Sequence, residues 1–285
     1  MISATTRTVT VRFGCLAYVE RGPEGGVPVV FIHGNSCDKR VFGGQMSSPA
    51  LQGFRLIAVD LSGHGDSSSG LIDPDTPYLV YSIPYHVESI RAFIQALALP
   101  APIVVGHSLG GHIAVALARQ IEIRGLFISQ APPIETPEDI SKAFHPLPEL
   151  GYLWNENLSD NELAAVVRVF GFTKGLPAFL SAAVRQTQPA CRRNLRASLV
   201  TDPPVNEVSS LATLACPVTI GLCPNDRLIN FDYMLGLDFG NKQNLRQVLF
   251  PASGHFPQLD EAMAFNQTLL DLARQTGSAS RIPAS

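Results

Sequence analysis

The chain has 285 residues, of which 46% are hydrophobic and 16% are charged, a composition typical of a globular protein with a large core. Its formal net charge is −3 and its pI is about 6.2, so the sequence lacks the basic footprint of a nucleic-acid-binding protein. It contains no run of roughly 18 apolar residues that could span a membrane, and its first residues do not resemble a signal peptide. We therefore expect neither a nucleic acid nor a membrane as a partner, and the sequence leaves the oligomeric state open.

The five cysteines are scattered along the chain: Cys15, Cys37, Cys191, Cys216 and Cys223. Their odd number and their spacing match neither a disulfide framework nor a close pair of metal ligands. We expect reduced cysteines that are mostly packed in the interior, which favours a cytoplasmic location.

Eight segments have the apolar or alternating patterns of strands: 8–13, 16–19, 27–32, 54–59, 103–105, 125–130, 217–222 and 247–250. The first two alternate in polarity on either side of Gly14 and predict an antiparallel hairpin at a sheet edge. Most later segments are almost continuously apolar, as in strands that are buried on both faces. Helical patterns separate most of them, so the order predicts a doubly wound, mostly parallel sheet.

The segments between these strands show helical spacing. Ser82 begins one helix that Pro100 ends, and another helix is expected over 231–239. The closing helix begins near Asp260. Its predicted inward-facing residues are Ala264, Phe265, Leu269 and Leu272.

The alternation of strands and helices stops in one long segment, where prolines separate short helical patterns and no strand pattern occurs. The clearest helix there begins at Ser159, and Glu162 completes a capping box. Because this insertion follows a strand of the sheet, we interpret residues 132–206 as a helical cap over the C-terminal strand ends. Residues 1–131 and 207–285 would then form the core domain, the alternative being that the insertion is another layer of the core.

A nucleophile is predicted where a β-branched strand leads directly into an alanine-rich helix. The junction reads Gly106-His107-Ser108-Leu109-Gly110, the Gly-x-Ser-x-Gly pattern of a nucleophile elbow. A side chain in place of either glycine would collide with the neighbouring strand or helix. Ser108 would lie at the helix N-terminus, where the helix dipole favours developing negative charge.

A serine hydroxyl needs a base and the base needs an acid. Among seven histidines, His255 alone follows a strand downstream of both the serine and an acid, which matches the order Ser, Asp, His of this architecture. Asp226 ends the preceding strand and is the predicted acid. Asp60 is the main alternative, although its Asp-x-x-Gly-His-Gly context is typical of a structured turn.

Ester cleavage also needs hydrogen-bond donors for the oxyanion. We expect them to be the backbone N–H of Leu109, next to the nucleophile, and that of Asn35 in the loop after the strand at 27–32. The Asn35 side chain could equally serve only to hold its own loop. These parts together need no metal and no organic cofactor.

The residues reached so far resemble the α/β-hydrolase superfamily over nearly the whole chain. The motifs that carry the resemblance are His-Gly-Asn-Ser at 33–36, Asp-Leu-Ser-Gly-His-Gly-Asp-Ser at 60–67, Gly-His-Ser-Leu-Gly-Gly-His-Ile at 106–113, Asn-Asp at 225–226 and Gly-His at 254–255. The resemblance implies an α/β-hydrolase fold, with an eight-stranded, mostly parallel, doubly wound sheet and an inserted helical cap.

Within the superfamily the chain is similar to the family of N-acyl-homoserine-lactone lactonases with this fold, which act in quorum quenching. The similar stretches include 72–75, 108–113, 124–126, 132–133 and 231–233. That resemblance implies that the nucleophile, base and loop asparagine fall on Ser108, His255 and Asn35. The family's glutamate acid falls on Asp226 here.

Two positions depart from the lactonase pattern. His107 stands where the family has tryptophan before the nucleophile, and Val166 stands where it has a cap tyrosine near the substrate carbonyl. These departures make a lactone one option among ester substrates. The residues expected to contact substrate are His107, Ser36, Trp154, Val166 and Phe170.

The sequence therefore predicts a serine hydrolase that cleaves a small-molecule ester or lactone with an apolar acyl part, forming an acyl-enzyme on Ser108. N-acyl homoserine lactones are one substrate class, and a general carboxylesterase is the alternative. A ligand receptor or a cofactor-free dioxygenase on the same fold also remains open. Serine rather than aspartate as nucleophile disfavours dehalogenase and epoxide hydrolase chemistry.

Overall fold

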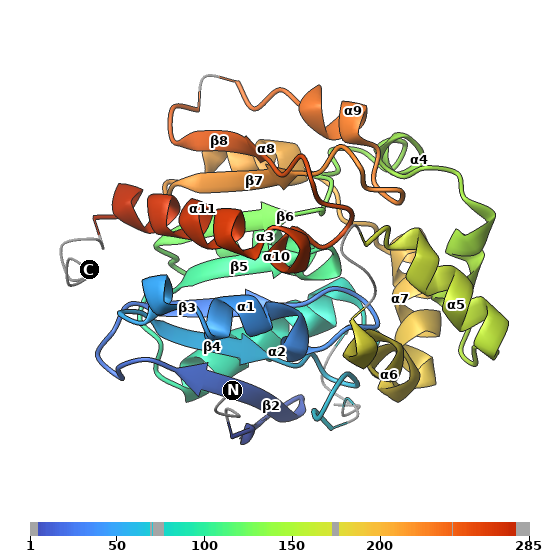
Figure 1. The fold of residues 1–285 in the computed structure, drawn as a ribbon, viewed down its shortest axis with the longest axis horizontal. Coiled ribbons are helices and arrows are strands. Elements are labelled where there is room, and N and C mark those ends of the chain that lie inside the picture. The colour runs from blue at the N-terminus through green and yellow to red at the C-terminus, as the bar shows by residue number, and fades with distance from the viewer. Residues whose placement is uncertain (1–4, 69, 71–76, 173–176, 241, 278–285) are drawn as a thin grey trace.

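The computed structural model describes residues 5–68, 70, 77–172, 177–240 and 242–277, so the stretch 72–75 lies outside the described residues. Within this part the strands form one eight-stranded sheet in the order β1-β2-β4-β3-β5-β6-β7-β8 (Figure 1). β1 and β2 are antiparallel to their neighbours, and β4, β3, β5, β6, β7 and β8 run parallel. The strands are β1 (Arg7–Val11), β2 (Gly14–Arg21), β3 (Pro28–Ile32), β4 (Arg55–Val59), β5 (Ile103–His107), β6 (Gly125–Ser129), β7 (Val218–Leu222) and β8 (Leu245–Leu249). The predicted doubly wound, mostly parallel sheet is confirmed.

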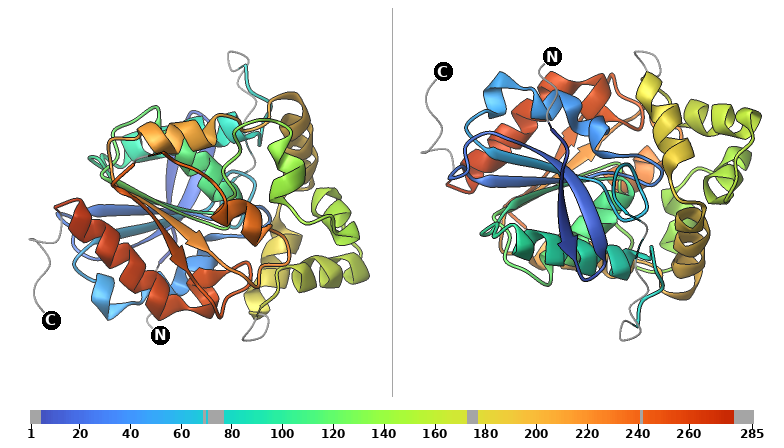
Figure 2. Two further views of the ribbon diagram at one scale, coloured as in Figure 1. Left: turned by 90° about the horizontal axis from the view of Figure 1, so that it is seen from above. Right: turned by 90° about the horizontal axis from the view of Figure 1, so that it is seen from below.

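Helices cover both faces of this sheet (Figure 2). One face carries α2 (Ile83–Ala96), α3 (Leu109–Ala118) and α8 (Glu207–Thr213). The opposite face carries η1 (Lys39–Phe42), α1 (Gly43–Met46), η2 (Pro49–Leu51), α10 (Pro257–Asp260) and α11 (Ala262–Gln275). Because both faces are covered, all five residues of each of the strands β3, β5, β6 and β7 are buried.

Two helices in the C-terminal part of the chain differ from the sequence prediction. Ala264 is exposed, although Phe265 and the two predicted leucines after it are buried. Thr268 and Leu272 lie on the same helical row as Ala264 and are buried, so its exposure follows from its place in the first turn of α11. The helix expected over 231–239 is shorter, because α9 (Phe231–Leu235) ends at Gly236, a residue with low helix propensity.

Residues 132–206, called the helical segment below, lie at the end of the sheet where the parallel strands have their C-termini (Figures 1 and 2). Its elements are α4 (Asp139–Ala143), η3 (Pro148–Trp154), α5 (Asp160–Val169), α6 (Ala178–Gln186) and α7 (Pro189–Thr201). The predicted capping box is present: Ser159 accepts from the Glu162 N–H, and the Glu162 carboxylate accepts from the Ser159 N–H. Among the described residues, no helix combines the length and the apolar character that crossing a bilayer requires.

Candidate active site

Ser108 alone forms the turn that joins β5 to α3. Its backbone has φ 53° and ψ −125°, a combination that a residue with a side chain rarely adopts. Two glycines permit this turn: a Cβ on Gly106 would lie 2.3 Å from the Gly110 carbonyl oxygen, and one on Gly110 would lie 2.2 Å from that of Ile32. The structure therefore contains a strained strand-to-helix turn with the serine at its apex, as in a nucleophile elbow.

His255 and Asp226 lie in the loops that follow the neighbouring strands β8 and β7. The His255 Nδ1 donates to Asp226 Oδ2 over 2.7 Å, and both side chains are buried. This bond keeps a proton on Nδ1 and leaves Nε2 as the basic nitrogen. His255 and Ser108 line the same cavity, although no hydrogen bond joins their side chains in the described structure.

Asp226 is surrounded by hydrogen-bond donors. Its Oδ1 accepts from the N–H groups of Leu228 at 2.7 Å and Ile229 at 3.2 Å, and its Oδ2 accepts from His255 and from Gln130 Nε2. Burial opposes ionisation, but the charge and hydrogen bond of His255 and the other donors outweigh it, so the pKa of Asp226 lies below its usual value. The carboxylate is therefore ionised at neutral pH despite its burial.

Gln130 is a site residue that the sequence interpretation missed. It directly follows β6, has a left-handed φ of 49°, and lines the cavity. Its Nε2 donates to Asp226, whereas its buried Oε1 has no partner among the described residues. Its place at the C-terminal end of a central strand was the available signal, because functional residues of parallel sheets gather there.

Two backbone N–H groups near Ser108 are placed to donate hydrogen bonds to a ligand. Leu109 is the first residue of α3, so its N–H has no acceptor within the helix. Asn35 lies in the loop after β3 and lines the same cavity. Neither N–H has a protein acceptor within the described residues, which is the condition an oxyanion-binding donor must meet.

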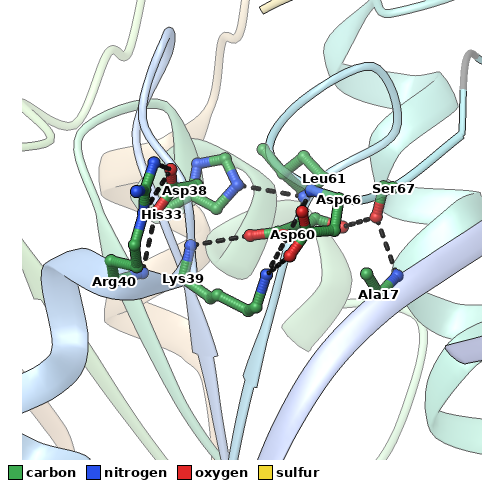
Figure 3. A network of polar contacts seen from close by, with 9 residues as sticks. All are labelled: Ala17, His33, Asp38, Lys39, Arg40, Asp60, Leu61, Asp66 and Ser67. Carbon is green, nitrogen blue, oxygen red and sulfur yellow. Dashed lines mark hydrogen bonds and ion pairs between the residues drawn. The ribbon is translucent and has the colours of Figure 1, made fainter. Parts of the chain in front are cut away.

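A buried polar network holds the loop after β3 in place (Figure 3). His33 Nε2 accepts from the Leu61 N–H at 3.0 Å, which joins this loop to the one after β4. The Lys39 ammonium donates to Asp60 and Asp66 at 2.6 Å each. Burial opposes the Lys39 charge, but the two carboxylates outweigh it and raise the pKa of this lysine.

Asp60 therefore has a supporting role, in agreement with the interpretation of its motif as a structured turn. Its carboxylate also accepts from the backbone N–H groups of Lys39 at 2.7 Å and Asp66 at 2.9 Å. No histidine of the described chain hydrogen-bonds to it. These hydrogen bonds of Asp60 join the loop after β3 to the loop after β4.

The cavity has a volume of about 260 Å³ and lies between the strand ends and the helical segment. None of its described lining residues is Lys, Arg, Asp or Glu. The apolar side chains that the helical segment contributes include Ile140, Phe144, Leu153, Trp154, Leu195 and Leu199. Such a lining favours an uncharged ligand with an apolar part.

The predicted contact residues occupy different places. His107, Trp154 and Phe170 line the cavity. Ser36 and Val166 are buried and are not among its described lining residues. Val166 belongs to α5 and packs into the main hydrophobic core. Ser36 follows Asn35 in the loop after β3, and its hydroxyl donates to Asn35 Oδ1 at 3.3 Å.

His107 packs against the catalytic candidates rather than pointing away from them. Its Nε2 donates to the carbonyl oxygen of His255 over 2.7 Å, and its ring lies 4.6 Å from that of Phe256. Burial, followed by the charge of His255, lowers the pKa of His107 to about 3. His107 is therefore a neutral side chain that fixes the loop carrying His255.

The sheet order, the strained serine turn and the buried carboxylate–imidazole pair define a hydrolase of the α/β class. A family model described as "Alpha/beta hydrolase family" matches residues 29–268. The chain belongs to this family.

Comparison with solved structures gives a similar result. A variant of the N-acyl homoserine lactonase AidH complexed with N-hexanoyl homoserine superimposes with a TM-score of 0.85 at 25% identity, over 96% of this chain and 98% of that one. An esterase from Exiguobacterium antarcticum has a TM-score of 0.75 at 20% identity, over 95% of this chain and 100% of that one, a likeness of fold alone.

Two curated relatives share parts of the sequence. A hydrolase of Paraburkholderia xenovorans, named for 2-hydroxy-6-oxononadienedioate and 2-hydroxy-6-oxononatrienedioate, is 26% identical over 94% of this chain and 95% of its own. The AB hydrolase superfamily protein YisY of Bacillus subtilis is 36% identical over 32% of this chain, and the match spans 31% of its length. The chain thus shares its fold and family with hydrolases, among them a lactonase.

Proposed function

We propose that the protein is a serine hydrolase that cleaves a carboxylic ester or lactone with an apolar acyl part, with N-acyl homoserine lactones as one substrate class. The Ser108 hydroxyl attacks the carbonyl carbon while His255 Nε2 takes its proton. The N–H groups of Leu109 and Asn35 stabilise the oxyanion. The imidazolium then protonates the leaving alkoxide, and an acyl-enzyme remains on Ser108.

Deacylation repeats these steps with water. His255 Nε2 takes a proton from the water molecule as it attacks the acyl carbonyl, and the returning proton releases Ser108. Asp226 stays ionised and stabilises the imidazolium in both half-reactions. In a lactone the alkoxide and the acyl group belong to one molecule, so the product is a single hydroxy acid.

One observation carries this proposal: a serine in a strained strand-to-helix turn and an imidazole bonded to a buried carboxylate line one cavity. The uncharged apolar lining supports the expected substrate class. The likeness to a lactonase with a bound homoserine derivative, over almost the full length of both chains, supports the lactone option.

We also propose that the helical segment, residues 132–206, acts as a cap on a core domain formed by 1–131 and 207–285. Its position at the C-terminal strand ends and its contribution to the cavity lining support this division. A cytoplasmic location is a further proposal, supported by the five cysteines, which are all free thiols.

The test is a substrate panel of p-nitrophenyl esters of increasing acyl length and N-acyl homoserine lactones. Wild type should form products, and mass spectrometry of a quenched reaction should show one acyl group on Ser108. Ser108→Ala should lose turnover by at least about 10⁴-fold. Ser129→Ala is the matched control, because its buried hydroxyl has no partner in the described structure and its loss should leave turnover unchanged. Turnover retained by Ser108→Ala would exclude the proposed nucleophile.

A further inference from the structure

Arg192 on α7 connects several parts of the helical segment to the core. Its side chain is buried, with the residue only 3% exposed. Its Nη1 donates to the Glu156 carbonyl oxygen at 3.2 Å, and its Nη2 donates to that of Val184. Its Nε donates over 3.1 Å to the hydroxyl of Ser36, which belongs to the loop after β3.

No acidic side chain among the described residues supplies a counter-charge for this guanidinium. In the part of the chain that the structure describes, its hydrogen-bond acceptors are two carbonyl oxygens and one hydroxyl, and no carboxylate pairs with it. A buried cation without a counter-charge is costly. A role that needs both the charge and the fixed donor geometry of arginine would account for its presence.

The third hydrogen bond of Arg192, to Ser36, reaches the loop after β3 that also contains Asn35. Ser36 accepts from Arg192 and donates its own hydroxyl proton to Asn35 Oδ1 at 3.3 Å. A charged donor polarises the hydroxyl that it bonds, which strengthens the next hydrogen bond in the chain. Ser36 also has a left-handed φ of 59°, so the loop is held in a conformation that a non-glycine residue rarely adopts.

We infer that Arg192 is a positioning residue that holds Asn35 in its oxyanion-binding place through Ser36. This inference rests on the proposed function, because it assigns a role within the same site. Arg192 is not among the described residues that line the cavity, so it acts through the loop and not on substrate. Since Arg192 also binds Glu156 and Val184, the seating of the helical segment and the alignment of the oxyanion donor depend on one side chain.

Loss of the Arg192–Ser36 support should weaken transition-state stabilisation more than substrate binding. A misaligned Asn35 N–H weakens its bond to the oxyanion, whereas the apolar walls that bind the acyl chain stay in place. Removing an oxyanion donor outright typically costs about 10²–10³-fold in kcat. Displacing one through its support should cost less, and we expect about a tenfold loss in kcat with KM changed by less than about twofold.

The experiment is a double-mutant cycle of Ser36→Ala and Arg192→Lys, measured on the best p-nitrophenyl ester of the panel. The second readout is inhibition by an alkylboronic acid, whose tetrahedral adduct on Ser108 places an oxygen in the oxyanion site. Arg193→Ala is the matched control, since the neighbouring arginine is exposed and pairs with the Glu156 side chain instead. Thermal unfolding of each variant reports on the stability of the fold.

The proposal expects each single variant to lose about tenfold in kcat and in boronate affinity, and the double variant to lose no more than either. It expects Arg193→Ala to match wild type. Additive losses in the double variant, or a lowered melting temperature with unchanged kcat and boronate affinity, would overturn it. If Arg192→Lys fails to fold, Ser36→Ala decides alone, because full boronate affinity there excludes the relay. A wild type that turns over no ester and no lactone of the panel would overturn the proposed function and this inference with it, whereas an active wild type with fully active variants would overturn this inference alone.

Discussion

Four buried imidazoles should make the protein lose stability between pH 6.5 and pH 5. Burial lowers the pKa of His33, His64, His86 and His107, in the last two cases to about 3. His86 and His107 are therefore neutral in the folded protein at pH 5, and the shifts of His33 and His64 have the same direction. In the unfolded chain a histidine has a pKa of about 6.5 and is mostly protonated at that pH.

The sign follows from proton linkage. The unfolded state binds more protons than the folded state below pH 6.5, so the free energy of unfolding falls as the pH falls. At pH 5 each neutral imidazole costs about 2 kcal/mol, and His86 and His107 together cost about 4 kcal/mol. His33 and His64 add to this with the same sign. A protein of this size has a total stability of about 5–15 kcal/mol, so the loss is large.

Urea unfolding monitored by circular dichroism at pH 8.5, 7.5, 6.0 and 5.0 measures this effect. We expect the free energy of unfolding to decrease by at least about 4 kcal/mol between pH 7.5 and pH 5. The buried carboxylates with lowered pKa, Asp38 and Asp226, lose their contribution only at lower pH, outside this window. His86→Phe removes one titrating ring whose Nδ1 has no partner in the described structure, and its decrease should be smaller by about 2 kcal/mol. Equal stability at pH 7.5 and pH 5, or an unchanged decrease in His86→Phe, would refute the reasoning.

Two further substitutions test the site and its support. Asp226→Asn should lower kcat by about 10³–10⁴-fold with little change in KM, because the amide cannot hold the proton on His255 Nδ1. Steady-state kinetics on a p-nitrophenyl ester measures this effect, and a loss below tenfold would contradict it. Lys39→Met should destabilise the fold by about 3–5 kcal/mol, because it leaves Asp60 buried without its counter-charge. Urea unfolding at pH 7.5 measures this change. A loss below about 1 kcal/mol would show that the pair contributes no net stability.

The parts of the protein that the sequence predicts best are those in which the signal is local. The central sheet strands are continuous apolar runs, and the turn at Ser108 requires glycines two residues before and after it, so both can be recognised within ten residues. The capping box at Ser159 is equally local. The prediction was wrong at helix ends: Ala264 in the first turn of α11 is exposed, and α9 ends at Leu235 and not at residue 239.

The contacts that the sequence did not predict join residues far apart in the chain. Gln130 and Asp226 are 96 positions apart, and Ser36 and Arg192 are 156 apart. Neither Gln130 nor Arg192 stands in a recognisable motif. Gln130 offers only the signal of its place directly after a central strand. Arg192 is a polar residue of an amphipathic helix, where such residues ordinarily face solvent, and only the three-dimensional arrangement shows that it is buried.

The two residues contribute to the electrostatics of the site in complementary ways. The Asp226 carboxylate accepts hydrogen bonds from four donors, one of which is Gln130. Each added donor lowers the basicity of the carboxylate, so the proton on His255 Nδ1 stays on the imidazole when the ring becomes positively charged. The negative charge of the site is thus held on Asp226 throughout the proposed reaction. Arg192, which has no carboxylate partner among the described residues, supports the loop on the opposite side, where the oxyanion forms. The described cavity lining has no Lys, Arg, Asp or Glu, so the oxyanion depends on the backbone N–H groups of Leu109 and Asn35, and the imidazolium depends on Asp226 behind it.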